Sequence, residues 1–236
     1  MSTPIRKVAL VGASGHLGPH LLSALTSSPT FTTTVITRHS SSALFPPSTT
    51  IHRVPDDYPY SELVHAFRGH DAVILSLNHL AEKCAATNFY GIDPTAKTAT
   101  IWGDGSTRFS SSTYAGIAQA VVSILENPVR TKNQTVYISS FEFSLNELLD
   151  AYKTIFGDEG WKVEYKEIDS GIEEARQKIG AEDFMTRMKA IGRLALLSTI
   201  KPGLGGNFVE SGISWNEELG MEREDLVEVL RRVLGR

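Results

Sequence analysis

Several features that would indicate particular classes of protein are scarce or absent in this 236-residue chain. It has one cysteine, Cys84, so it cannot form an internal disulfide, and its first residues contain no charged-then-apolar signal segment. No apolar run is long enough to span a bilayer. The formal net charge of -4 gives nucleic acid no electrostatic attraction. These absences predict an intracellular, cytoplasmic protein that binds neither membranes nor nucleic acid directly.

A glycine-rich turn is the most informative feature that is present. The apolar run Val8–Val11 leads directly into Gly12-Ala13-Ser14-Gly15-His16-Leu17-Gly18, which opens a helical pattern. Gly12 allows a sharp turn, Gly15 allows backbone N–H groups to approach a pyrophosphate, and Gly18 allows helix and strand to pack closely. The N-terminus of the helix favours an anion through its unpaired N–H groups and its dipole. The turn therefore predicts a dinucleotide-binding loop.

Strands and helices alternate along the first half of the chain. Hydrophobic patterns predict strands at residues 6–12, 33–37, 50–54, 71–77, 98–102, 135–139 and 161–168. They predict helices at residues 17–26, 61–68, 79–88, 113–125, 145–156, 171–198 with a break near Gly180, and 223–234. This order indicates an α/β protein with a doubly wound, Rossmann-like parallel sheet. Residues 1–140 are expected to form the nucleotide-binding domain, and residues 141–236 a small, mostly helical C-terminal region that packs on it and holds substrate.

The end of the second predicted strand carries Arg38 rather than a carboxylate. A carboxylate at this place would bind the ribose 2′-hydroxyl of NAD, whereas a guanidinium can pair with the 2′-phosphate of NADP. Ser40 to Ser42 add hydroxyl donors beside it. The site is therefore predicted to hold NADP.

The segments 12–18, 35–40, 71–77, 97–105, 113–125 and 136–140 together resemble the NmrA-like and isoflavone-reductase-like proteins, atypical members of the short-chain dehydrogenase superfamily. The resemblance implies that Gly12, Ser14, Gly15, His16, Leu17, Gly18 and Arg38 hold NADP. It also implies that Ser76 and Leu77 line the path of the ribose and nicotinamide. A small aromatic or secondary-metabolite substrate is expected.

The chain departs from this family between Asn78 and Gly91, where only a dozen residues stand in place of a further strand and helix. A six-stranded sheet cannot be completed by so short a join, so the sheet is expected to be abbreviated or closed by later strands. The join also lacks the segment that carries the family's catalytic lysine. The neighbours of Lys83 do not match that segment, and a solvated lysine is the favoured interpretation of this residue.

No other catalytic pattern replaces the missing one. No tyrosine is followed by a lysine four residues later, which is the proton-donating pair usual in the superfamily. His16 and His20 lie one helical turn apart without a glutamate between them, so no metal site is predicted. The catalytic residues are therefore unassigned.

Four interpretations follow from these residues. The first is an NADP-dependent reductase of a small-molecule substrate, and the second is a non-catalytic NADP-binding redox sensor that regulates a protein partner. The third is a non-redox cyclase or isomerase that reuses the family pocket. In the fourth, the short join reflects an alternative exon junction that leaves a poorly competent chain. A homodimer or a regulatory protein partner is compatible with the first two.

Overall fold

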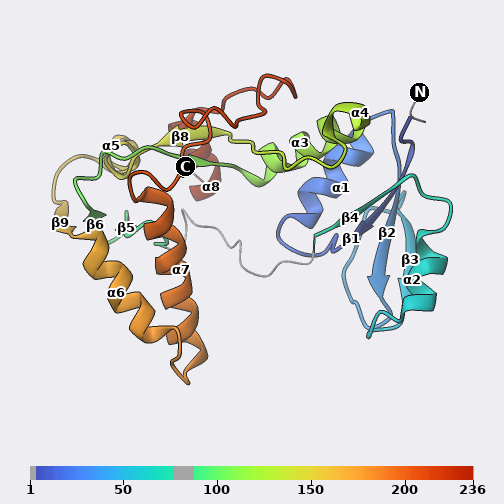
Figure 1. Ribbon diagram of the computed structural model, residues 1–236, viewed down its shortest axis with the longest axis horizontal. Coiled ribbons are helices and arrows are strands. Elements are labelled where there is room, and N and C mark those ends of the chain that lie inside the picture. The colour runs from blue at the N-terminus through green and yellow to red at the C-terminus, as the bar shows by residue number, and fades with distance from the viewer. Residues whose placement is uncertain (1–3, 77–87, 236) are drawn as a thin grey trace. The chain divides into compact units, whose positions relative to one another are not determined.

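The computed structural model describes residues 4–76 and 88–235, which group into two compact units (Figure 1). We call the first the sheet unit; it draws on residues 1–82, 113–136 and 215–221. The second, the helical unit, draws on residues 83–112, 137–214 and 222–236. The two predicted domains, residues 1–140 and 141–236, have other bounds than these units. A domain boundary after residue 140 stays a prediction.

The sheet unit contains a parallel sheet in the order β3-β2-β1-β4. Its strands are β1 (Lys7–Val11), β2 (Thr32–Arg38), β3 (Thr50–Val54) and β4 (Ala72–Leu75). Helices α1 (Gly18–Ser27) and α2 (Tyr60–Phe67) connect β1 to β2 and β3 to β4. The predicted α/β fold with a Rossmann-like parallel sheet is confirmed.

Helices cover both faces of this sheet. Val8 and Leu10 of β1 pack in one core with α1 and with α3 (Tyr114–Glu126), which returns to the sheet from later in the chain. The alternate residues Ala9 and Val11 pack in a second core with Ala66 of α2. Because successive side chains of a strand point to opposite faces, this division shows that the sheet is doubly wound.

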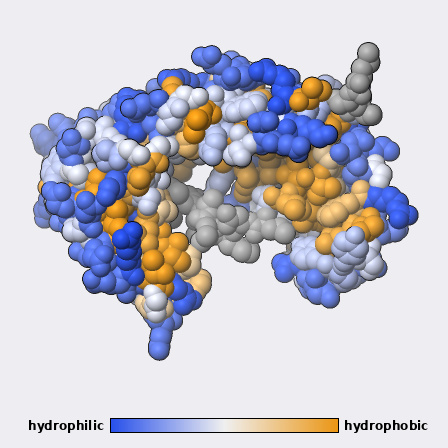
Figure 2. All heavy atoms as spheres, viewed as in Figure 1, coloured by the Kyte–Doolittle hydropathy of each residue, from blue (hydrophilic) through white to orange (hydrophobic). Residues whose placement is uncertain are grey.

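The sheet ends at β4, and among the described residues no strand pairs with the outer edge of β4. Val73 and Leu75 lie beside Ala9 and Val11 in the register, on the α2 face, yet they are 42% and 67% exposed. Hydrophobic side chains gather on the visible face of this unit (Figure 2). The abbreviated sheet that the short join predicts is therefore present, and part of its α2 face is uncovered.

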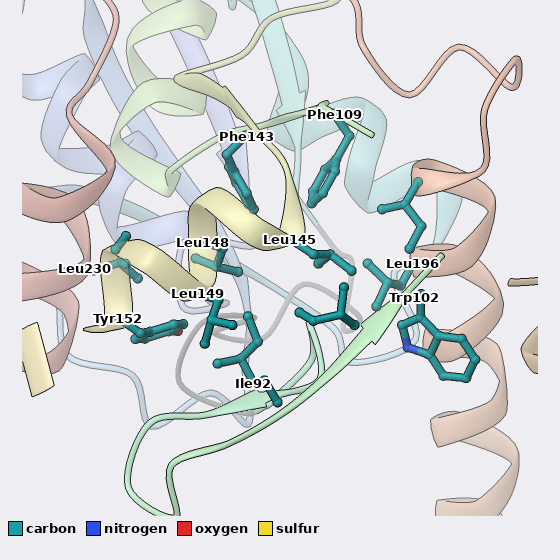
Figure 3. Close-up of a cluster of buried hydrophobic side chains, with 14 of the residues drawn as sticks. Ile92, Trp102, Phe109, Phe143, Leu145, Leu148, Leu149, Tyr152, Leu196 and Leu230 are labelled. Carbon is teal, nitrogen blue, oxygen red and sulfur yellow. The ribbon is translucent and has the colours of Figure 1, made fainter. Parts of the chain in front are cut away.

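The helical unit has its own core, built around α5 (Leu145–Phe156) (Figure 3). Its strands form a three-stranded sheet and a separate pair: β5 (Ile92–Asp93), β6 (Thr98–Trp102) and β9 (Lys162–Lys166), then β7 (Phe109–Ser111) and β8 (Phe141–Phe143). Its other helices are α6 (Ile168–Lys178), α7 (Phe184–Ile200) and α8 (Leu226–Leu234). The predicted capping box begins α5: the Ser144 hydroxyl accepts from the Glu147 amide, and the Glu147 carboxylate accepts from the Ser144 amide.

Some predicted elements are wrong or fall outside the described residues. Residues 135–139 form no strand, and only Tyr137 makes an isolated bridge, to Ser214. The strands that do form nearby, β7 and β8, are three residues each and too short to show periodicity. By contrast, the helix predicted at residues 113–125 is confirmed as α3, which ends at Glu126, and Pro128 begins a separate short helix, α4 (Pro128–Thr131). The predicted helix at 79–88 lies almost entirely outside the described residues.

None of the described helices has the length and apolar character needed to cross a membrane.

Gly18 should be intolerant of any side chain. A Cβ there would lie 2.3 Å from the Gly12 carbonyl oxygen and 2.4 Å from the Ala13 carbonyl carbon. Gly18→Ala should lower the free energy of unfolding by about 1–3 kcal/mol, the range for overpacking, as measured by urea denaturation. The matched control is Gly15→Ala, since a Cβ at Gly15 would lie 3.4 Å from its nearest neighbour, in ordinary contact. Equal stability of the two variants would contradict the packing described.

Candidate functional site

The carboxyl ends of the four parallel strands bring the predicted site residues to one edge of the sheet. The register pairs Val11 of β1 with Ile36 of β2 on one side and with Leu75 of β4 on the other. The glycine turn that follows β1 therefore lies between Arg38 and Ser76. In open parallel sheets, ligands bind outside this edge, at the place where the strand order reverses, which here is the β1–β4 boundary.

The glycine turn is packed tightly at its two ends and is open in the middle. Gly12 has φ of 89°, a conformation that strongly favours glycine, and Gly18 is buried against the backbone of Gly12 and Ala13. Gly15 is exposed and has room above it. The Ser76 carbonyl oxygen would lie 3.7 Å from a Cβ at Gly15, so the turn and the end of β4 are neighbours. A ligand backbone can approach most closely at Gly15.

The N-terminus of α1 offers donors to an anion. Its N-cap residue, Leu17, makes no side-chain cap, and Pro19 stands in the first turn, where its missing N–H costs no hydrogen bond. Within the described part of the chain, the amides of Ser14 and Leu17 donate no hydrogen bond. Ser14 and His16 are exposed. Unpaired N–H groups and the positive end of the helix dipole together suit a pyrophosphate.

The second part of the edge is the segment 38–41, which follows β2. Arg38 is exposed, as its predicted role requires. The Arg53 guanidinium of β3 donates through one nitrogen to the carbonyl oxygens of Arg38 at 3.0 Å, His39 at 3.4 Å and Ser41 at 3.0 Å. The Ser40 amide donates to the Asp56 carboxylate at 3.1 Å. The end of β3 thus fixes the backbone of the segment that carries Arg38.

A groove of about 360 Å³ connects the glycine turn with the chain beyond this segment. It is lined by Ala13 and Ser14 of the turn, by residues of α1 that include Leu22 and Ser23, and by residues 43–46. Leu44 is almost fully exposed beside it. The groove is large enough for part of a nucleotide and lies next to the glycine turn.

Sequence reasoning identified the glycine turn, Arg38 and Ser76, and the structure places all of them at one edge. Leu77, Lys83 and Cys84 lie outside the described residues. Arg53 and Asp56 were missed, although both stand at the end of the predicted third strand, whose carboxyl end must share that edge. Across residues 4–76 and 88–235, no group of three or more histidine, cysteine, aspartate or glutamate side chains is placed to hold a metal ion.

The chain resembles known oxidoreductases in sequence and in fold. No protein-family model matches it. It is 28% identical over 299 aligned positions to the oxidoreductase aprR of Aspergillus flavus, covering 97% of this chain and 98% of that protein. A solved isoflavone reductase superposes with a TM-score of 0.69 at 14% identity, covering 98% of this chain and 99% of that one. The NADPH complex of leucoanthocyanidin reductase from Vitis vinifera gives 0.70 at 12% identity, covering 98% and 100%. The predicted resemblance to isoflavone-reductase-like proteins is confirmed at the level of fold.

The alignment with the Aspergillus relative is longer than this chain. Its 299 positions exceed the 236 residues of the chain by 63. At least that many positions of the alignment therefore stand opposite gaps in this chain. Because the alignment covers 98% of the relative, these gaps lie within the chain and not beyond its ends. A missing segment between Asn78 and Gly91 stays a prediction.

The Asp56 carboxyl should titrate below its ordinary pKa of 3.8, because Ser40 donates to it from its side chain and its amide, and Arg38 and His39 add positive charge nearby. Ser40→Ala removes the largest cause, so the pKa of Asp56 should rise in that variant, as followed by carbon-detected NMR of the carboxyl group. Since the folded pKa is lowered, the ionised carboxylate favours the folded segment at neutral pH, and this contribution is lost as pH falls through that pKa. Ser42→Ala is the control, and an equal shift in both variants would contradict the assigned cause.

Proposed function

We propose that this chain binds NADP(H) at the carboxyl edge of its sheet and acts as an oxidoreductase of the isoflavone-reductase-like type. The observation that carries the proposal is the meeting of two features at that edge. One is a glycine turn with an uncapped helix N-terminus, and the other is an exposed arginine at the end of β2. The name of the Aspergillus relative and the NADPH bound by the grapevine reductase support the same assignment.

The residues present fit such a cofactor. The amides of the turn and the dipole of α1 would hold the pyrophosphate, and the exposed Gly15 leaves space for its close approach. Arg38 would pair with the 2′-phosphate, because the residue at the end of β2 is an arginine and not the carboxylate that would repel this group. The nearby Asp56 carboxylate accepts a hydrogen bond from the Ser40 amide. Ser14, His16 and Leu17 complete the turn, and Ser76 would line the path toward the nicotinamide.

The nicotinamide cofactor supplies or accepts a hydride when it is bound, and the protein contributes binding, orientation and the exclusion of water. We propose a small aromatic or secondary-metabolite substrate. Support comes from the fold shared with a protein named isoflavone reductase and another named leucoanthocyanidin reductase. The proton donor is not among the residues assigned here. A cytoplasmic location and a homodimer or regulatory partner remain predictions from the sequence.

A second candidate is a non-catalytic NADP-binding sensor. The specific observation that favours it is the shortened chain, which leaves at least 63 positions of the alignment with its Aspergillus relative without a counterpart. The absent family segment includes the one expected to carry the catalytic lysine. A chain that keeps the cofactor edge but loses that segment would retain binding while losing chemistry.

The wild-type protein should bind NADPH more tightly than NADH, as measured by fluorescence titration. Arg38→Ala should weaken NADPH binding by about 1.5–3 kcal/mol, the range for a hydrogen bond to a charged group, and should leave NADH binding nearly unchanged. The control is Arg68→Ala, because Arg68 is an exposed arginine at the C-terminus of α2, in the same unit. A wild-type protein without a preference for NADPH would refute the NADP assignment.

A measurement of NADPH consumption distinguishes the reductase from the non-catalytic sensor. If the chain is a reductase, NADPH should be consumed with at least one member of a panel of aromatic enones, ketones and benzylic ethers, as followed by loss of NADPH absorbance. Tight NADPH binding with no consumption across the panel would reject the reductase and favour the sensor. Gly15→Ala is the matched variant, because the added methyl group should weaken binding and turnover together while the fold is kept.

A further inference from the structure

The segment 38–41 is held in place by one side chain of the neighbouring strand. Arg53 pairs with Thr37 in the register between β2 and β3, so its backbone lies beside the end of β2. From there a single guanidinium nitrogen reaches three carbonyl oxygens, those of Arg38, His39 and Ser41, at 3.0 to 3.4 Å. Because one nitrogen donates to three carbonyl oxygens of the same turn, the Arg53 side chain constrains the conformation of that turn.

The backbone amides of the segment are already occupied. The His39 amide donates to the Val54 carbonyl at 2.9 Å, the Ser40 amide to Asp56 at 3.1 Å, and the Ser41 amide to the Arg38 carbonyl at 3.1 Å. Amides are the usual uncharged donors to an anion, and here all three have acceptors within the protein. An added phosphate would therefore have to be recognised by side chains and not by these amides.

Without the Arg53 guanidinium, the carbonyl groups of the segment would disfavour a phosphate beside them. Each carbonyl oxygen carries the negative end of a dipole, and three of them converge on one place next to Arg38. The Arg53 guanidinium lies on that place, satisfies all three and adds a full positive charge that is present at any pH. It therefore fixes the turn and offsets the negative ends of these three dipoles with a positive charge.

We propose that Arg53 is a positioning and specificity-determining residue for the 2′-phosphate of NADP. The inference rests on the proposed NADP site. Arg53 acts by holding the backbone from which Arg38 projects and by neutralising the carbonyl groups of residues 38, 39 and 41. It is therefore expected to affect the part of the ligand that distinguishes NADP from NAD, and to leave the adenosine and pyrophosphate contacts unchanged.

Two small ligands isolate this effect, because 2′,5′-ADP and 5′-AMP differ only by the 2′-phosphate. Isothermal titration of both ligands is compared in the wild-type chain, Arg53→Met and Arg53→Lys. Arg53→Met should weaken 2′,5′-ADP about twofold to fivefold, the upper part of the range for losing one exposed charge contact, and should change 5′-AMP by less than about 1.5-fold. Arg53→Lys keeps the charge and should recover part of the loss. Arg68→Met, which removes an exposed arginine with no contact to the segment, should change neither ligand.

The outcomes separate this inference from the proposed function. An unchanged affinity of Arg53→Met for 2′,5′-ADP, in a wild-type chain that prefers 2′,5′-ADP, would overturn the role of Arg53 and leave the NADP site standing. An equal loss for both ligands would also overturn it, because Arg53 would then support the site as a whole. A wild-type chain that binds both ligands equally would refute the NADP site itself and the inference with it. Thermal unfolding of each variant is measured as the control that the fold is retained.

Discussion

The close approach of α1 to the end of β1 is the constraint on which the cofactor site depends. Gly18 permits it, since any Cβ there would lie within 2.5 Å of the Gly12 and Ala13 backbone. This contact sets where the helix begins, and therefore where its unpaired N–H groups and its positive dipole end lie. In this arrangement Gly18 is buried and Gly12 is half-buried, while Gly15 is exposed. One packing contact thus produces a surface that suits a pyrophosphate, without any charged side chain.

The two parts of the site are held by different forces. Packing of glycine against backbone holds the turn after β1, whereas polar contacts from the end of β3 hold the turn after β2. The first part suits what NAD and NADP share, and the second suits the phosphate that separates them. Among residues 4–76 and 88–235, no strand pairs with the outer edge of β4, whose Val73 and Leu75 are exposed. The described part of the sheet therefore contains the edge proposed to bind a cofactor, beside an open edge strand.

Local patterns in the sequence were sufficient for the parts of the fold that local forces determine. The boundaries of β3 and β6 were predicted to the residue, because β-branched runs there lie between clear turn residues. The capping box of α5 was predicted because both partners lie within four residues. The strand predicted at 135–139 was wrong because its β-branched residues find no partner strand, and pairing depends on the tertiary fold. Arg53 and Asp56 were missed for a related reason: their contacts with residues 38–41 join positions twelve or more residues apart.

Backbone amide chemical shifts recorded during titration with NADPH would show whether the carboxyl edge of the sheet binds NADP. We expect the largest changes at residues 12–18 and 38–41, with smaller changes at Ser76. Changes confined to the helical unit, for example to the polar pocket between residues 106–108 and 199–211, would contradict it.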